Sequence, residues 1–333
     1  MRTTTLALVS LLTACVAPIG DRTHDDFGPD AGVDGSSATG ACDNLKTVTM
    51  NLTVSGTANY TGLPSTCWKL NGKLTITGPA VSSVEKLGDL REVTDLEIND
   101  ADISAFNTKN PVEVGGDIYI HNNDKLTDIS KVVAKSTIKS LRVDFNPLLT
   151  NLGGANKATI VSGLTSITNN VKLGSVDLSS AQRLEGGVAI SDNGALTTIQ
   201  LTTLQSVGSF SVERNPLLTT LSNMSSMTQV HGAFTINDND SLVSLGQFGT
   251  GITFSSTIVV SNNLKLADVG ALQYAGSVLG SMAFNNNSAL DYTRAHDVAC
   301  CVPGTGLFSA SGNKTSQCAG NHYCLNTQQQ CNR

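Results

Sequence analysis

The sequence is poor in charge, in aromatic side chains and in proline. Of its 333 residues only 14% are charged and 5% are aromatic, and eight are proline. With 40% hydrophobic residues, this excludes disorder over most of the chain, because disordered chains are highly charged and poor in apolar side chains. No apolar run reaches the roughly 18 residues that a membrane-spanning helix needs. The net charge of −6 argues against nucleic acid as a partner.

What the chain does contain is glycine, 31 residues of it, with abundant asparagine, serine and threonine. Because aromatic residues are few, a core must consist mainly of leucine, isoleucine and valine. This composition favours many short strands separated by turns.

An internal repeat dominates the sequence. An asparagine recurs every 22 to 24 residues, with a leucine three residues after it and an alternating apolar pair such as Ile118 and Ile120 before it. The recurring asparagines are Asn123, Asn146, Asn170, Asn193, Asn215, Asn239, Asn263 and Asn287. Such a period predicts a solenoid in which each turn contributes one short strand to a parallel sheet. We expect about ten turns, with the asparagine amides forming a ladder along one corner.

The pattern apolar-x-apolar-x-x-Asn-x-x-Leu resembles that of leucine-rich-repeat-like solenoids, and most closely the receptor L domain. The resemblance covers about residues 42–293 and implies an all-β fold, a right-handed parallel β-helix. Cys42, followed by Cys67 and the segment 68–76, looks like the cysteine-paired entry of that domain, so the resemblance implies a disulfide between Cys42 and Cys67. The array differs from the receptors in running without a second L domain or a cysteine-rich module between domains.

The amino terminus is typical of an exported protein. Residues 1–14 contain Arg2 and a short apolar run, and the sequence 12–15, Leu-Thr-Ala-Cys, resembles the lipobox of bacterial lipoproteins. The resemblance implies cleavage before Cys15 and acylation of that residue; the alternative is an ordinary secretory peptide cut a few residues later. Residues 15–41 then form a lipidated cysteine and a flexible acidic linker. Val16, rather than an aspartate, follows the cysteine, which in Gram-negative lipoproteins leaves sorting to the outer membrane open.

The carboxyl-terminal segment, residues 294–333, is rich in cysteine. It contains Cys300, Cys301, Cys318, Cys324 and Cys331. In an exported protein these cysteines predict a disulfide-rich cap over the open end of the solenoid, of undetermined connectivity. Because five is an odd number, one thiol is free, pairs across chains, or the cap assignment is wrong. A zinc cluster is disfavoured because no paired Cys-x-x-Cys units occur, so no metal is expected.

The outward strand positions of the early turns carry the most chemistry. They are Glu97, Tyr119, His121, Arg142 and Asp144, whereas later turns present small residues. A face with an aromatic ring and several charges is the better candidate for contact with a partner. Asp144 and His121, with Arg142 nearby, are also the candidate acid–base cluster of a polysaccharide lyase or hydrolase.

No sequence motif of a nucleophilic serine, a zinc protease or a phosphate-binding loop occurs, and no cofactor is expected. The sequence therefore predicts an extracytoplasmic, membrane-anchored lipoprotein, in the outer membrane of a Gram-negative bacterium. We expect a non-enzymatic role in recognition, adhesion or envelope structure, with a protein or glycan ligand. The alternative is a glycan-processing β-helix enzyme.

Overall fold

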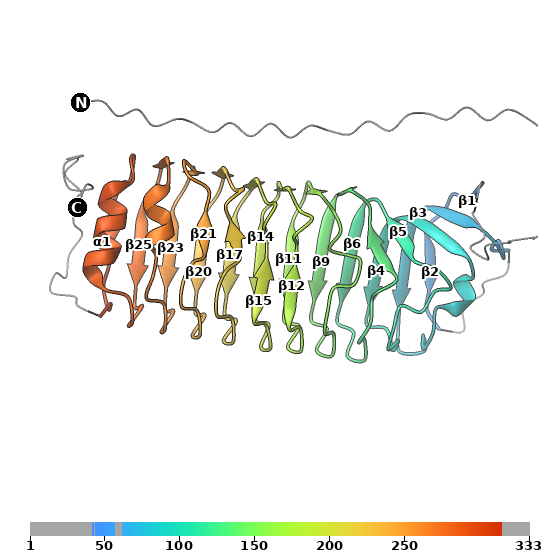
Figure 1. Cartoon of the computed structure of the whole chain (residues 1–333). Helices are drawn as coiled ribbons and strands as arrows, with labels where there is room; N and C mark the ends of the chain where they lie inside the picture. The colour runs from blue at the N-terminus through green and yellow to red at the C-terminus, as the bar shows by residue number, and fades with distance from the viewer. Residues whose placement is uncertain (1–41, 43, 57–61, 315–333) are drawn as a thin grey trace, which may run out of the picture. The chain divides into compact units, whose positions relative to one another are not determined.

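A computed structural model describes residue 42, residues 44–56 and residues 62–314, all within the structural unit Cys42–Arg333. Within these residues the fold is an all-β parallel β-solenoid, as the repeat predicts, and it has about 11 turns where the sequence predicts about ten (Figure 1). The predicted signal peptide and acidic linker, with Cys15, and the cysteines Cys318, Cys324 and Cys331 lie outside the described residues.

One long parallel sheet of 15 strands runs the length of the solenoid. Its strands are β1 (Lys46–Val48), β2 (Leu52–Val54), β3 (Trp68–Thr77), β4 (Leu90–Asn99), β5 (Val112–Val114), β6 (Asp117–His121), β7 (Val132–Ala134), β9 (Ser140–Asp144), β11 (Thr165–Thr168), β14 (Val188–Ser191), β17 (Phe210–Glu213), β20 (Phe234–Asn237), β23 (Ile258–Ser261), β25 (Met282–Asn285) and β26 (Phe308–Ser309). From β4 to β26 each turn adds a strand to this sheet.

Shorter strands form a second parallel sheet with seven members. These are β8 (Thr137–Ile138), β10 (Ile160–Val161), β13 (Arg183–Leu184), β16 (Ser206–Val207), β19 (Gln229–Val230), β22 (Thr253–Phe254) and β24 (Ser277–Val278). Two further pairs join β12 (Ser175–Asp177) to β15 (Thr198–Gln200) and β18 (Asn223–Met224) to β21 (Gln247–Phe248). The helical segments are η1 (Glu85–Leu87), η2 (Gly270–Tyr274) and α1 (Tyr292–Cys301). Among the described residues no helix is long and apolar enough to cross a membrane.

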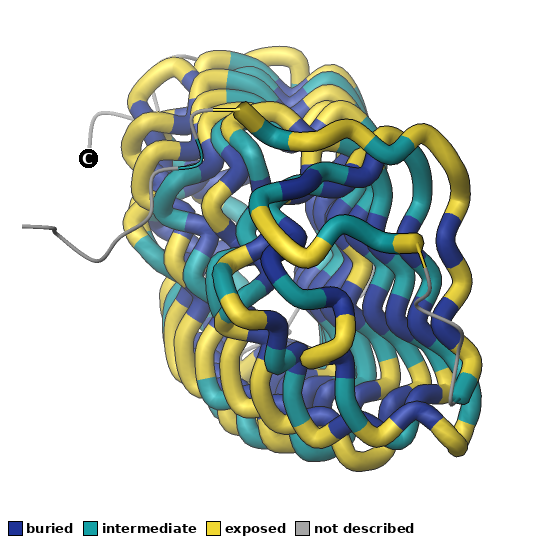
Figure 2. The backbone as a smooth tube through the Cα atoms, turned by 90° about the vertical axis from the view of Figure 1, so that its right-hand side faces the viewer, coloured by how far each residue is buried: buried dark blue, intermediate teal, exposed yellow. Residues whose placement is uncertain are grey.

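Alternation along the strands places the core inside the solenoid. In β14, β17, β20, β23 and β25 the first and third residues are buried and the second and fourth are half-buried on the outer face. Successive side chains of a strand point to opposite faces of the sheet, so the apolar pair of each turn stacks on that of the next. Buried positions accordingly follow one another from turn to turn when the solenoid is viewed from its amino-terminal end (Figure 2).

The predicted asparagine ladder is present, and all eight asparagines are fully buried. Asn215 illustrates the pattern: its Nδ2 donates to the carbonyl oxygens of Ile190 at 3.0 Å and Glu213 at 2.9 Å. Its Oδ1 accepts the backbone N–H of Asn193 at 3.1 Å. Equivalent backbone-to-side-chain bonds link the ladder asparagines from Asn146 to Asn287. The side chains therefore satisfy backbone groups that the corner would otherwise leave buried without partners.

The solenoid extends past residue 293, where the sequence pattern ends. Strand β26 pairs with β25, and Asn313 forms a ninth ladder position, its Oδ1 accepting the backbone N–H of Asn287 at 2.9 Å. Helix α1 is inserted within this turn, which lengthens the interval from Asn287 to Asn313 to 26 residues. The expected boundary between solenoid and cap therefore falls within a turn. Cys300 and Cys301, at the end of α1, are each disulfide-bonded.

Candidate functional site

The candidate face predicted from the sequence lies on three adjacent strands of the long sheet. Glu97 on β4, Tyr119 on β6 and Arg142 on β9 are register partners and form one column. His121 on β6 and Asp144 on β9 are partners in the next column. Since these strands pair directly, the structure brings all five side chains onto one surface although they span 48 residues of the sequence.

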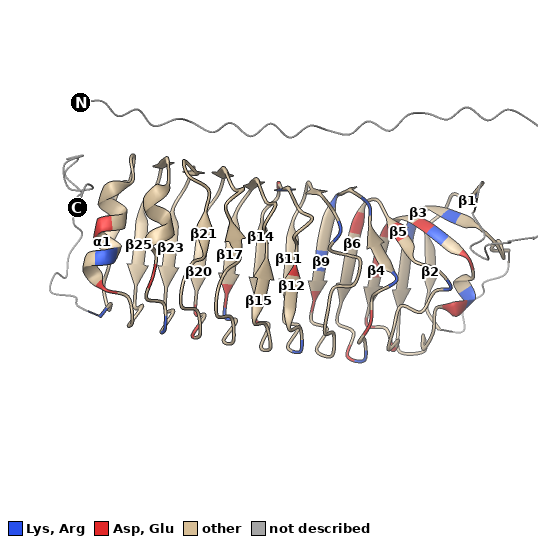
Figure 3. Ribbon diagram, in the orientation of Figure 1, with Lys and Arg blue, Asp and Glu red and all other residues tan. Residues whose placement is uncertain are grey.

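Charged side chains gather on this part of the sheet (Figure 3). Strand β4 carries four charged residues, β3 and β9 carry two each and β6 carries one, whereas the corresponding strands β11, β14, β17, β20, β23 and β25 carry a single one between them, Glu213. The column that contains Tyr119 and Arg142 continues through small residues, as the sequence predicts. Its later members are Ser166, Ala189, Ser211, Thr235, Val259 and Ala283.

Glu97 is tied into an ionic network. Its carboxylate lies 2.7 Å from Lys73 Nζ and 3.6 Å from His121 Nε2. Burial raises the pKa of Glu97, but the hydrogen bond and charge of Lys73, together with those of His121, outweigh it and hold the pKa below its ordinary value. Glu97 is therefore an ionised acceptor at neutral pH.

Tyr119 and Arg142 form the aromatic part of the face. The Tyr119 ring stacks on the His121 ring with centroids 3.9 Å apart, and the Arg142 guanidinium lies 5.8 Å from the Tyr119 ring centroid. This is the distance of a cation–π interaction, which favours a guanidinium over an aromatic face. Arg142 itself is exposed, so its donors are accessible.

Asp144 is oriented by the next turn. Its Oδ1 accepts hydrogen bonds from the hydroxyl groups of Ser166 at 2.8 Å and Thr168 at 2.9 Å. The carboxylate within 4 Å of the His121 ring is that of Glu97, on the preceding turn. The polar partner of His121 thus lies on β4, to one side of β6 and β9, whereas the partners of Asp144 lie on β11, to the other side.

A groove of about 400 Å³ opens beside Tyr119 and Arg142. Its polar lining consists mainly of Lys73, Asp95, Asp117, Tyr119, Lys139 and Arg142. Of the predicted face, only Tyr119 and Arg142 belong to this lining; Glu97, His121 and Asp144 do not. Sequence reasoning missed the other members because they precede the alternating apolar pair of each turn. Lys73, Asp95 and Asp117 stand immediately before that pair, and Lys139 stands two residues before it. Charged residues at these positions are the signal that could have identified them.

The carboxylates of the groove are engaged by neighbouring donors. Asp117 accepts a hydrogen bond from Lys139 Nζ at 2.8 Å, and its own backbone N–H donates to Asp95 Oδ1 at 2.7 Å. Burial raises the pKa of Asp117, but hydrogen bonds from Lys139 and Ser140 and the charges of Lys139 and Arg142 lower it below its ordinary value. Asp117 is consequently an ionised acceptor that Lys139 holds in the groove.

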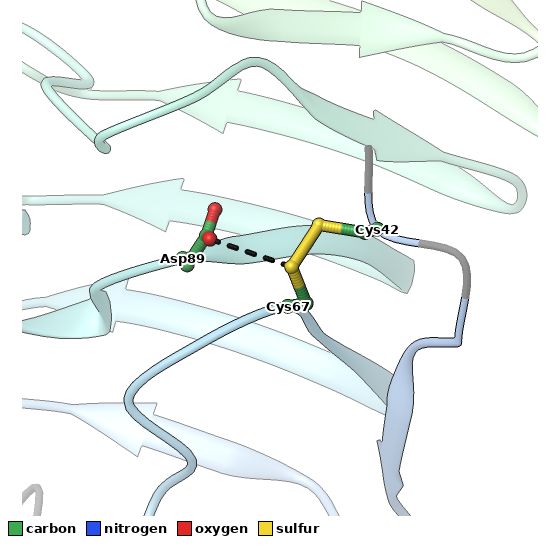
Figure 4. A group of neighbouring side chains, drawn as sticks. All are labelled: Cys42, Cys67 and Asp89. Atoms are coloured by element: carbon green, nitrogen blue, oxygen red, sulfur yellow. Dashed lines mark hydrogen bonds between the residues drawn. A yellow bond between two sulfur atoms is a disulfide. The ribbon is translucent and has the colours of Figure 1, made fainter. Parts of the chain in front are cut away.

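The amino-terminal end contains the predicted Cys42–Cys67 disulfide (Figure 4). Among the described residues, Cys42, Cys67 and Asp89 form the only group of three or more metal-ligand-type side chains close enough to share an ion. Because a disulfide carries no thiolate, this cluster is not a metal site. Asp89 instead pairs with Arg91 Nε at 2.6 Å and accepts from Asn110 Nδ2 at 2.5 Å, so its carboxylate is engaged by neighbouring donors.

Comparison with known proteins yields no match to any family model, curated protein or solved structure. The structure shows a parallel β-solenoid, and the receptor L domain is a resemblance of the sequence pattern alone.

Proposed function

We propose that the protein is a membrane-tethered extracytoplasmic lipoprotein that acts by recognition, with its contact surface on the early turns of the solenoid. The observation that carries this proposal is the pairing of Tyr119 and Arg142 at a polar groove, in a column whose later turns carry small residues. Tyrosine and arginine contribute disproportionately to binding energy at interface centres.

Attachment is part of the same proposal. The lipobox-like segment ending at Cys15 and the acidic linker 15–41 would hold the solenoid at the surface of a membrane, the outer membrane in a Gram-negative bacterium. A Cys15→Ser variant should leave the membrane fraction or remain unprocessed. Normal cleavage with unchanged membrane retention would contradict lipid attachment without bearing on the binding surface.

The alternative is a glycan lyase or hydrolase that uses Asp144 and His121. General acid catalysis calls for a carboxyl group whose pKa is raised toward neutrality. Among the described residues, every carboxyl group with a resolved shift has a pKa below its ordinary value; these groups are Asp89, Glu97, Asp117, Asp177 and Asp192. The side chains of Asp144 and His121 also have different partners, Ser166 and Thr168 for Asp144 and Glu97 for His121, which favours binding over proton transfer between the two.

Affinity capture from envelope extract tests the proposal with the full chain as bait. The double variant Tyr119→Ala/Arg142→Ala should lose a partner that wild type retains, by about thirtyfold in affinity, since truncating an anchor costs ~2 kcal/mol. The matched control, Ser211→Ala/Thr235→Ala, changes the same column in later turns and should bind as wild type does. Equal losses in both variants would place the contact elsewhere. Turnover of an envelope polysaccharide that Asp144→Asn abolishes would overturn the proposal in favour of the enzyme.

A further inference from the structure

Arg142 differs from the other arginines that the structure describes. Four of them lie within 4 Å of a carboxylate: Arg91 with Asp89, Arg183 with Glu185, Arg214 with Asp192, and Arg294 with Asp268. No carboxylate of the described residues lies within that distance of Arg142, and its recorded contact is with the Tyr119 ring. A guanidinium presents a planar fork of donors that matches a carboxylate in two parallel hydrogen bonds. Arg142 therefore offers this fork to a ligand.

The ion pairs of the groove leave the same cation available. Three cations, Lys73, Lys139 and Arg142, and two carboxylates, Asp95 and Asp117, line it. Lys73 is paired with Glu97, which lies outside the lining, and Lys139 is paired with Asp117. These pairings leave Arg142 to receive an anionic group of a ligand, beside the Tyr119 ring, and Asp95 to accept from its donors.

The other residues that line the groove indicate the chemical class of a ligand whose carboxylate would bind Arg142. Lysine and aspartate are depleted at the cores of protein–protein interfaces, yet they form much of this groove. Hydroxyl groups both donate and accept, so a polyhydroxylated ligand can donate to Asp95 and Asp117 and accept from Lys139. The volume of about 400 Å³ lies within the range of small-molecule sites.

We infer that the groove beside Tyr119 binds an acidic oligosaccharide, with a uronic-acid carboxylate on Arg142 and sugar hydroxyls on the neighbouring charged side chains. This inference rests on the proposed recognition function and names its ligand class. Lys73, Asp95, Asp117 and Arg142 sit on the paired strands β3, β4, β6 and β9, and Lys139 immediately precedes β9, so the site is preformed and needs no rearrangement of the backbone.

Isothermal titration of the full chain in detergent tests the inference with defined probes. These are hexasaccharides of galacturonic acid and of mannuronic acid, their methyl esters, and dextran sulfate of similar size. At least one uronic-acid hexamer should bind, and Arg142→Gln should weaken that binding tenfold or more while leaving thermal unfolding unchanged. Arg142→Lys should bind with intermediate affinity, because an ammonium keeps the charge but lacks the fork. Arg183→Gln, which removes an exposed arginine of the opposite sheet, should match wild type.

Each other outcome is informative. Equal binding of the acid and its methyl ester, or equal binding of dextran sulfate, would exclude recognition of a carboxylate and overturn the inference. Failure of both hexamers to bind would do the same. The proposed function would nevertheless stand if Tyr119→Ala/Arg142→Ala still abolished capture of an envelope partner. If Tyr119→Ala/Arg142→Ala retained both the binding of the hexamer and the capture of the envelope partner, the proposed function would be contradicted as well.

Discussion

The side-chain oxygen of Asn239 accepts two hydrogen bonds from Asn215, one from its backbone N–H at 3.0 Å and one from its Nδ2 at 3.3 Å. Both residues are fully buried. Because Asn215 does the same for Asn193, each turn depends on the next for the partners of its corner groups. The ladder thus couples neighbouring turns through polar contacts as the apolar pair couples them through packing.

Replacing Asn215 with alanine should destabilise the protein by about 3 kcal/mol, since each buried group left without a partner costs ~1–3 kcal/mol. The backbone N–H of Asn193 and the carbonyl of Ile190 would both lose a bond. Urea unfolding of the full chain measures the difference. Asn223→Ala is the control, because Asn223 is exposed and its Oδ1 accepts only the local backbone N–H of Ser225. Similar unfolding midpoints for the two variants would contradict a structural role for the ladder.

The solenoid could be predicted from the sequence because every turn carries the same residue pattern. The same apolar alternation and the same asparagine recur in successive turns, so an irregular turn does not obscure the pattern. Thr165 is one such irregularity: it is fully buried at an inward position that is apolar in neighbouring turns. The last turn escaped detection because α1 lengthens it and because no leucine follows Asn313 at the usual distance.

The candidate site was predictable only in part, for a different reason. Outward residues of the alternating segment follow from its phase, so Tyr119 and Arg142 could be placed in one column. Asp117 stands immediately before the alternating apolar pair and Lys139 two residues before it, and the sequence period does not specify which residues at these positions face the groove. Which cation lacks a carboxylate is likewise a property of distances in space, and the sequence does not determine it.

Close stacking of the corners makes Gly280 intolerant of a side chain. A Cβ added there would lie 2.6 Å from the carbonyl carbon of Ser256 and 2.7 Å from the amide nitrogen of Thr257, both backbone atoms. Gly280→Ala should therefore cost about 1–3 kcal/mol, as overpacking typically does. Gly174→Ala is the matched control, because nothing lies within 4 Å of its added Cβ. A comparison of thermal unfolding midpoints decides the matter, and equal midpoints would show that the corners can separate freely.

The amino-terminal end of the solenoid should lose stability at acidic pH. Burial raises the pKa of Asp89, but hydrogen bonds from Arg91, the Cys67 backbone and Asn110 and the charge of Arg91 lower it below its ordinary value. A carboxyl group with a depressed folded-state pKa contributes stability above its unfolded pKa, near 3.9, and loses it as pH falls through the folded value. The temperature at the unfolding midpoint should thus fall when the pH is lowered below about 4. In Asp89→Asn this drop should be shallower, with the two proteins converging at the lowest pH; parallel curves would refute the assignment.

Phe145 occupies a backbone position that suits asparagine better. Its φ is +55°, the left-handed region, and the residue before each ladder asparagine repeats this conformation. At six of these eight positions the residue is asparagine or aspartate, namely Asn122, Asn169, Asp192, Asp238, Asn262 and Asn286. Left-handed backbone costs an ordinary L-residue about 1–2 kcal/mol, and asparagine less.

Because Phe145 is 54% exposed, its ring recovers little of that cost through burial. Phe145→Asn should therefore stabilise the protein by about 1 kcal/mol, which urea unfolding can measure. Arg214 has the same conformation, with φ +52°, but its guanidinium holds Asp192 through two bonds of 2.7 and 2.9 Å. Arg214→Asn relieves the same strain and removes that pair, so it should gain less than Phe145→Asn. A loss of stability in Phe145→Asn would mean that the exposed ring makes a contact worth more than the strain it maintains.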